Sequence, residues 1–63
     1  MLLGHYQVAA EHFRAALRAE ASAKIAFNLG LAYQRLGHNP ESESAYRQAL
    51  ELNPLYTEAQ QNL

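Results

Sequence analysis

The sequence predicts an all-α fold built from antiparallel helix pairs, and three observations predict it. Residues that favour strands are scarce, since only Val8, Ile25 and Thr57 are β-branched, whereas alanine occurs 12 times and leucine 10 times. Apolar residues recur at helical spacing between short polar breaks. Two of the resulting segments also match each other at a constant distance along the chain. With 63 residues, the chain is at most one small domain.

The first segment predicts one amphipathic helix over Tyr6–Ala19. Its apolar stripe follows the offsets i, i+3, i+4, i+7 and i+8, and consists of Ala9, His12, Phe13, Ala16 and Leu17. We expect His12 to be packed at the edge of this stripe. We also predict a break at Gly4 and His5, so that Met1–Leu3 would be the end of a preceding helix.

The second segment predicts a helix over Ser22–Leu36. Ser22 is a suitable N-cap, Gly37 suits the position after the last turn, and Pro40 prevents the helix from continuing.

This second helix is apolar almost all round. Phe27 and Leu31 point away from the apolar stripe that starts at Ile25, and a helix that is apolar on every side is buried. Gly30 lies on the flank between, where it costs helix stability unless a neighbour comes close. We therefore predict close approach of another helix at Gly30.

The third segment predicts a helix over Pro40–Leu52. Its apolar stripe repeats the offsets of the first segment and consists of Ser42, Ala45, Tyr46, Ala49 and Leu50. Asn53 and Pro54 end this helix. Leu55–Leu63 are expected to begin another one, because Leu55, Ala59 and Leu63 form a short apolar stripe.

The first and third segments are copies of each other at an offset of 33 residues. The matched pairs are Gly4 with Gly37, Ala9 with Ser42, Phe13 with Tyr46, Ala16 with Ala49, and Leu17 with Leu50. A helix pair that recurs near 33–34 residues indicates an α-solenoid.

Individual residues identify the type of solenoid. The chain contains Ala26-x2-Leu29-Gly30-x2-Tyr33, then Gly37, then Ser42-x3-Tyr46, and finally Asn53-Pro54. These residues resemble the signature of the tetratricopeptide repeat family over essentially the whole chain. The departures are Ala26 in place of a bulky aromatic residue, Ser42 in place of a small apolar one, and Ala21 in place of proline. The resemblance implies a right-handed stack of antiparallel helix-turn-helix repeats.

The family's layout divides the chain into three parts. Residues 1–21 would be the second half of one repeat, 22–54 one complete repeat, and 55–63 the start of a third repeat or a capping helix. The chain is therefore expected to be a piece of a longer array.

Composition argues against catalytic and metal-dependent functions. Cysteine and aspartate are absent, so disulfides, thiolate metal sites, Ser-His-Asp triads and EF-hand loops are excluded. His5, His12 and His38 lack metal-binding spacing, and we expect His5 and His38 to lie in turns at helix ends. We expect no enzyme activity, no metal and no cofactor.

Charge and hydropathy limit the class of partner. The formal net charge is −1, which provides no basic surplus for nucleic acid. No targeting signal and no apolar run of 18 residues occurs, so membrane insertion is not expected and the chain is predicted to be soluble. The compartment stays open, with the cytoplasm favoured over a bacterial periplasm.

The resemblance implies a peptide-binding surface on the second helix. In the family, the first helix of each repeat lines a concave groove that holds peptide segments of partner proteins. The corresponding residues here are Lys24, Phe27, Asn28, Leu31, Gln34 and Arg35. Relatives that clamp acidic C-terminal tails carry lysine and asparagine where Phe27 and Leu31 stand, so we expect an apolar or mixed ligand. Alternatively, Phe27 and Leu31 pack against the first helices of adjacent repeats, and both roles can hold together.

The predicted function is a non-catalytic module for protein–protein interaction. A structural spacer or self-associating unit of a longer solenoid is an alternative, and so is a docking arm of a larger enzyme. Because a repeat stack needs neighbours to cover its apolar ends, the isolated chain is also predicted to associate with another copy of itself.

Overall fold

Three helices make up most of the chain in the computed structural model, which describes residues 2–56, 59 and 61. They are α1 (Leu2–Ala19), α2 (Ala23–Arg35) and α3 (Asn39–Leu52), and the described residues contain no strand. The predicted all-α class is therefore confirmed.

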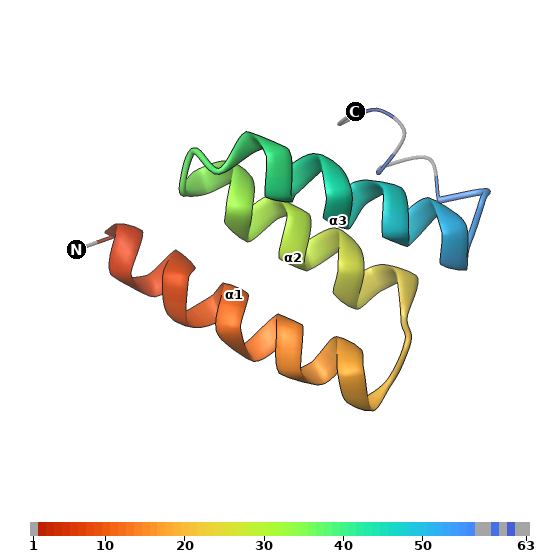
Figure 1. Cartoon of the computed structure of the whole chain (residues 1–63), viewed down its shortest axis with the longest axis horizontal. Helices are drawn as coiled ribbons and strands as arrows, with labels where there is room; N and C mark the ends of the chain where they lie inside the picture. Colours follow the sequence, from red (N-terminus) through yellow and green to blue (C-terminus); the bar gives the residue numbers. More distant parts are fainter. Residues whose placement is uncertain (1, 57–58, 60, 62–63) are drawn as a thin grey trace.

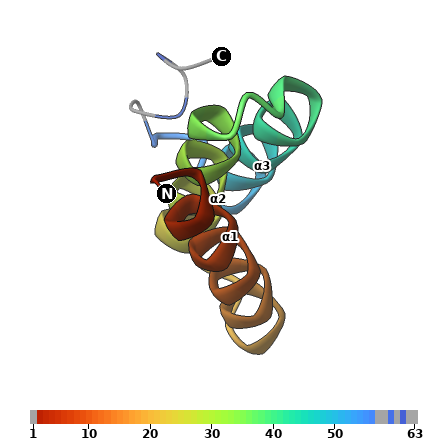
Figure 2. The same cartoon turned by 90° about the vertical axis from the view of Figure 1, so that its left-hand side faces the viewer.

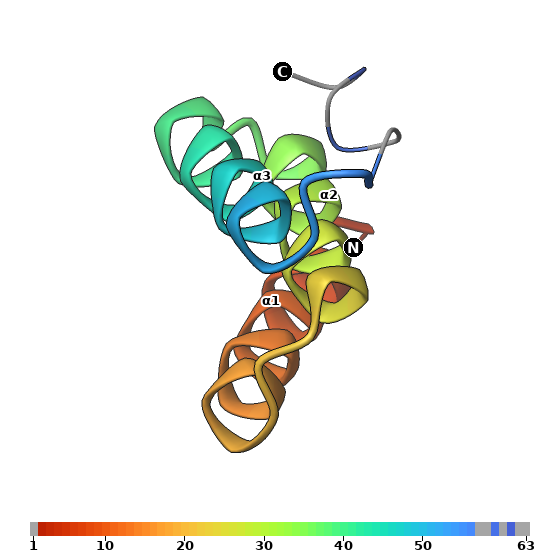
Figure 3. The same ribbon diagram turned by 90° about the vertical axis from the view of Figure 1, so that its right-hand side faces the viewer.

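The helices are arranged as an antiparallel series in which α2 is the middle member. Each helix runs back along the one before it, and three-residue connections join them (Figure 1). The two end-on views place α2 between α1 and α3 (Figures 2 and 3). Accordingly, α2 packs extensively against both of the other helices. Beyond α3, Ala59 packs against residues of both α2 and α3.

Helix α1 is longer than the sequence predicts. It begins at Leu2 and passes without interruption through Gly4 and His5, so the predicted break there is wrong, and His5 does not lie in a turn. A single glycine inside a helix costs only about 1 kcal/mol relative to alanine, and no proline follows it here. The prediction for His12 is also wrong, since its side chain is exposed.

The ends of α2 follow the sequence prediction closely. The Ser22 Oγ accepts a hydrogen bond from the Ile25 backbone N–H at 3.4 Å, as an N-cap does. At the other end, Gly37 has a φ of +78°, and its N–H donates to the Gln34 carbonyl. The His38 N–H donates to the Tyr33 carbonyl, which completes a Schellman motif. The His38 ring stacks on Tyr33 with 6.2 Å between ring centroids.

The contact between α2 and α3 centres on Gly30. A Cβ atom at this position would lie 2.6 Å from Cε1 and 2.7 Å from Cδ1 of Tyr46, so only glycine allows the ring to lie there. The Ser42 hydroxyl donates to the Gly30 carbonyl at 3.0 Å, and the Tyr46 hydroxyl donates to Gln34 Oε1 at 2.7 Å. The close approach predicted at Gly30 is confirmed.

The buried side chains form two clusters on different faces of α2. The first lies between the three helices, and its buried members are Ala10, Leu29, Ala32 and Ala45. The second joins α2 and α3 to the chain beyond, and its buried members are Ala26, Phe27, Tyr46, Ala49 and Ala59. Alanine at position 26 is therefore fully buried, with a phenylalanine beside it in the sequence that fills the same cluster.

Candidate functional site

The six residues predicted to bind a peptide all lie on α2, but the structure separates them by environment. Phe27 is buried, Asn28 and Leu31 are half-buried, and the rest are exposed. The exposed ones are Lys24, Gln34 and Arg35. The six therefore do not form one open surface.

Phe27 is covered by aromatic and small side chains. Its ring centroid lies 5.6 Å from that of Tyr46 and 5.2 Å from that of Tyr56, with the rings tilted in both pairs. Ala59 belongs to the same cluster, and Phe27 is left only 9% exposed. Phe27 is therefore packed inside the chain, against α3 and the residues that follow it.

Asn28, Leu31 and Arg35 lie together in a groove between α1 and α2, which we call the α1/α2 groove. Its volume is about 230 Å³. The residues that line it are Tyr6, Ala9 and Phe13 from α1, and Asn28, Leu31, Ala32 and Arg35 from α2. Most of these side chains are apolar, with an amide and a guanidinium as the polar groups, as in many ligand grooves.

The contribution of α1 to this groove is absent from the predicted site. The internal repeat could have predicted this contribution of α1, because Ala9 and Phe13 match Ser42 and Tyr46 at the same offset of 33 residues. On α3, those two residues face α2 and contact Gly30. A residue that contacts a neighbouring helix in one copy of the repeat is a candidate for an equivalent helix contact in the other copy.

Lys24 and Gln34 lie outside the α1/α2 groove. Gln34 accepts the hydrogen bond from the Tyr46 hydroxyl, which directs its side chain toward α3. Lys24 is exposed in the first turn of α2.

Within the described ranges, no three histidine or acidic side chains come together in a way that could hold a metal ion. A search of the same residues finds no helix that is long and apolar enough to span a membrane.

Comparison with known proteins adds one match. A protein-family model described as "Tetratricopeptide repeat" matches residues 23–60, which is more than half of the chain and includes all of α2 and α3. No curated protein and no solved structure matches the chain.

Proposed function

Because the chain belongs to the tetratricopeptide repeat family, we propose that it is a non-catalytic interaction module whose α1/α2 groove binds an apolar helical segment of a partner protein. Repeats of this family generally mediate protein–protein interaction, typically as scaffolds. The proposal specifies the surface and the form of the ligand.

The observation that carries the proposal is the equivalence between α1 and α3. Ser42 and Tyr46 of α3 are covered by a helix, which approaches them at Gly30. Ala9 and Phe13 are their counterparts on α1, and both are only half-buried and line an open groove. The matching face therefore suits the same kind of occupant, a helix with a small residue over the aromatic ring.

The energetics favour an apolar occupant. Fully burying a phenylalanine side chain contributes roughly 1.5–3 kcal/mol, and Phe13 is part of the floor of the groove. Asn28 and Arg35 supply the polar groups that orient a ligand, and Arg35 favours an acidic residue at the adjoining position of the partner.

A peptide copied from α2 of this chain tests the proposal, because α2 already packs on the matching face of α3. We expect a synthetic peptide of residues 22–37 to shift NMR signals of Ala9, Phe13 and Leu31. An Ala9→Glu variant should lose these shifts, since the carboxylate would occupy an apolar groove.

The matched control is Ala15→Glu, which makes the same change at an exposed position of the same helix. It should bind the peptide normally. Equal loss in both variants, or shifts confined to other surfaces, would contradict the proposal.

Self-association is a second candidate function, favoured by exposed apolar side chains. Val8 is 53% exposed and Leu55 is 84% exposed, and they offer a second copy apolar surface outside the groove.

A further inference from the structure

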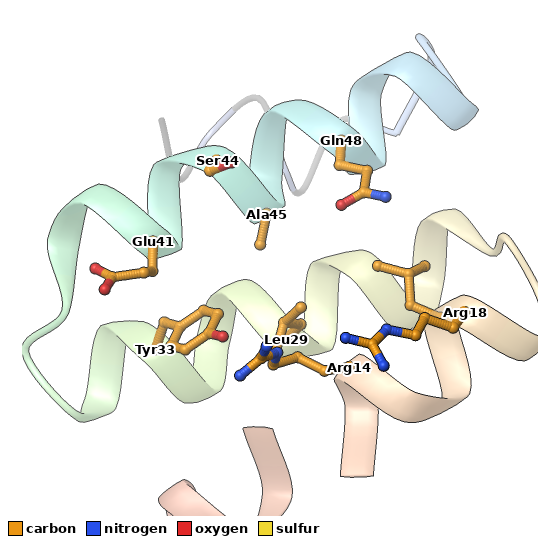
Figure 4. A pocket seen from close by; sticks show the side chains of 9 residues that line it. Arg14, Arg18, Leu29, Tyr33, Glu41, Ser44, Ala45 and Gln48 are labelled. Atoms are coloured by element: carbon orange, nitrogen blue, oxygen red, sulfur yellow. The ribbon is translucent and has the colours of Figure 1, made fainter. Parts of the chain in front are cut away.

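A second groove lies between α1 and α3 and has a different chemistry. Its floor contains Leu17, Leu29 and Ala45, and its volume is about 330 Å³ (Figure 4). The face of α2 at its base carries Leu29 and Tyr33, whereas the α1/α2 groove uses Asn28 and Leu31. We call it the α1/α3 groove.

One wall of the α1/α3 groove is cationic. Arg14 and Arg18 line it from α1, four residues apart, and Figure 4 shows both side chains extending over Leu29. At a rise of 1.5 Å per residue, their Cα atoms are about 6 Å apart along the helix axis. Neither guanidinium forms an ion pair with another described residue. Two like charges one turn apart repel each other mildly, and a bound anion would relieve this.

The remaining polar groups are distributed unevenly along the α1/α3 groove. Gln48 points into it from α3, across the groove from Arg18, and its amide can donate and accept hydrogen bonds. Glu41 lies beside Tyr33, and both line a further pocket together with Arg14. An anionic ligand therefore fits between the two arginines and away from Glu41, where the Gln48 amide can hydrogen-bond its backbone.

We propose that the α1/α3 groove binds an extended peptide that carries two acidic side chains at positions i and i+2. In an extended chain these side chains point to the same side and lie about 6.6 Å apart, close to the spacing of Arg14 and Arg18. Each carboxylate then accepts a bidentate hydrogen-bond pair from one guanidinium. The apolar floor contacts the methylene groups of the acidic side chains.

The formal net charge of −1 disfavours nucleic acid, whose binding depends on a basic surplus.

A fluorescein-labelled peptide Gly-Ser-Glu-Leu-Glu-Ser-Gly, titrated with the full 63-residue chain, tests the proposal by anisotropy. The Arg14→Gln/Arg18→Gln double variant should bind it about five- to tenfold more weakly, because two partly exposed ion pairs are lost. A peptide with glutamine in place of both glutamates should bind the unmodified chain equally weakly. A peptide with adjacent glutamates should lose part of the affinity, since only one can reach an arginine.

The matched control is Arg47→Gln, which removes an exposed arginine that lies outside the α1/α3 groove and is paired with Glu43. It should bind the acidic peptide normally. An equal loss with Arg47→Gln would show a non-specific charge effect and overturn the proposal. Three other results would also overturn the proposal. They are equal affinity for the glutamate and glutamine peptides, no binding at millimolar protein concentration, and tighter binding of a single-stranded oligonucleotide through the same two arginines.

Discussion

Gly30 and Tyr46 meet with no room for one more carbon atom between them. The ring of Tyr46 is only 1% exposed, and its hydroxyl is held by Gln34, so the ring has nowhere to move when a side chain is added at position 30. An all-round apolar helix interrupted by one glycine is the sequence pattern that predicts such a contact. It does not identify the partner, because that depends on how α3 lies across α2.

Gly30→Ala is expected to destabilise the fold despite the better helix propensity of alanine. The gain of about 1 kcal/mol from propensity opposes an overpacking cost of about 1–3 kcal/mol, and the new Cβ lies too close to a fixed ring for the gain to prevail. Gly30→Leu should cost more. Thermal and urea unfolding measure both effects.

The same substitution in a Tyr46→Leu background provides the control. A smaller side chain at position 46 leaves space for the Cβ, so Gly30→Ala should cost less there, or stabilise. The same cost in both backgrounds would mean that the ring is not what excludes a side chain.

Phe27 shows which part of the site cannot be read from one helix. Its direction from α2 can be predicted from the sequence, yet the side chains that cover it come from Tyr46 of α3 and from Tyr56 and Ala59 beyond α3. Periodicity gives the direction of a side chain but not what covers it. The α1/α2 groove could not be predicted from α2 alone for the same reason, since α1 supplies part of the surface around Leu31.

At the scale of helices, the two glycines at equivalent repeat positions have different effects on the helix that contains or precedes them. Gly37 ends α2 in the left-handed region, whereas Gly4 lies within α1. Pro40 follows Gly37 within three residues, stands in the first turn of α3, and cannot extend the preceding helix. Only His5 and further helix-compatible residues follow Gly4, so the predicted break there has no proline to enforce it. The end of α2, which has both a capping glycine and a following proline, could be predicted from the sequence. The predicted helix end at Gly4, which lacks a proline, was wrong.

Gly37→Ala is expected to destabilise the chain by about 1 kcal/mol, because an L-residue with a Cβ pays roughly 1–2 kcal/mol in the left-handed region. Nothing lies within 4 Å of a Cβ at this position, so the cost comes from the backbone alone. Gly37→Asn is the comparison variant and should cost less, since asparagine tolerates this region. Chemical denaturation measures both, and equal costs would contradict the assignment.

At the scale of the whole molecule, apolar surface remains exposed on both α1 and the C-terminal end of α3. Val8 is exposed on α1, the α1/α2 groove is open, and Leu52 and Leu55 are exposed at and just after the end of α3. A chain of this size has little core, so covering one more large side chain changes its stability appreciably.

We expect the 63-residue chain to associate with itself as concentration rises. Light scattering over a hundredfold range should show a mass that increases above 7.1 kDa, with a melting temperature that rises in parallel. Leu55→Glu should weaken the association, because it places a charge on the most exposed of these side chains. A constant monomer mass with a concentration-independent, cooperative melt would contradict this expectation.

The order of packing along the chain has a kinetic consequence. The extensive contacts join α1 to α2 and α2 to α3, which are consecutive in sequence and connected by short loops. Folding therefore needs little closure of long loops, and proteins with such local contacts reach the native state in microseconds to milliseconds. Each helix pair can close once its second helix has left the ribosome, without waiting for later residues to emerge.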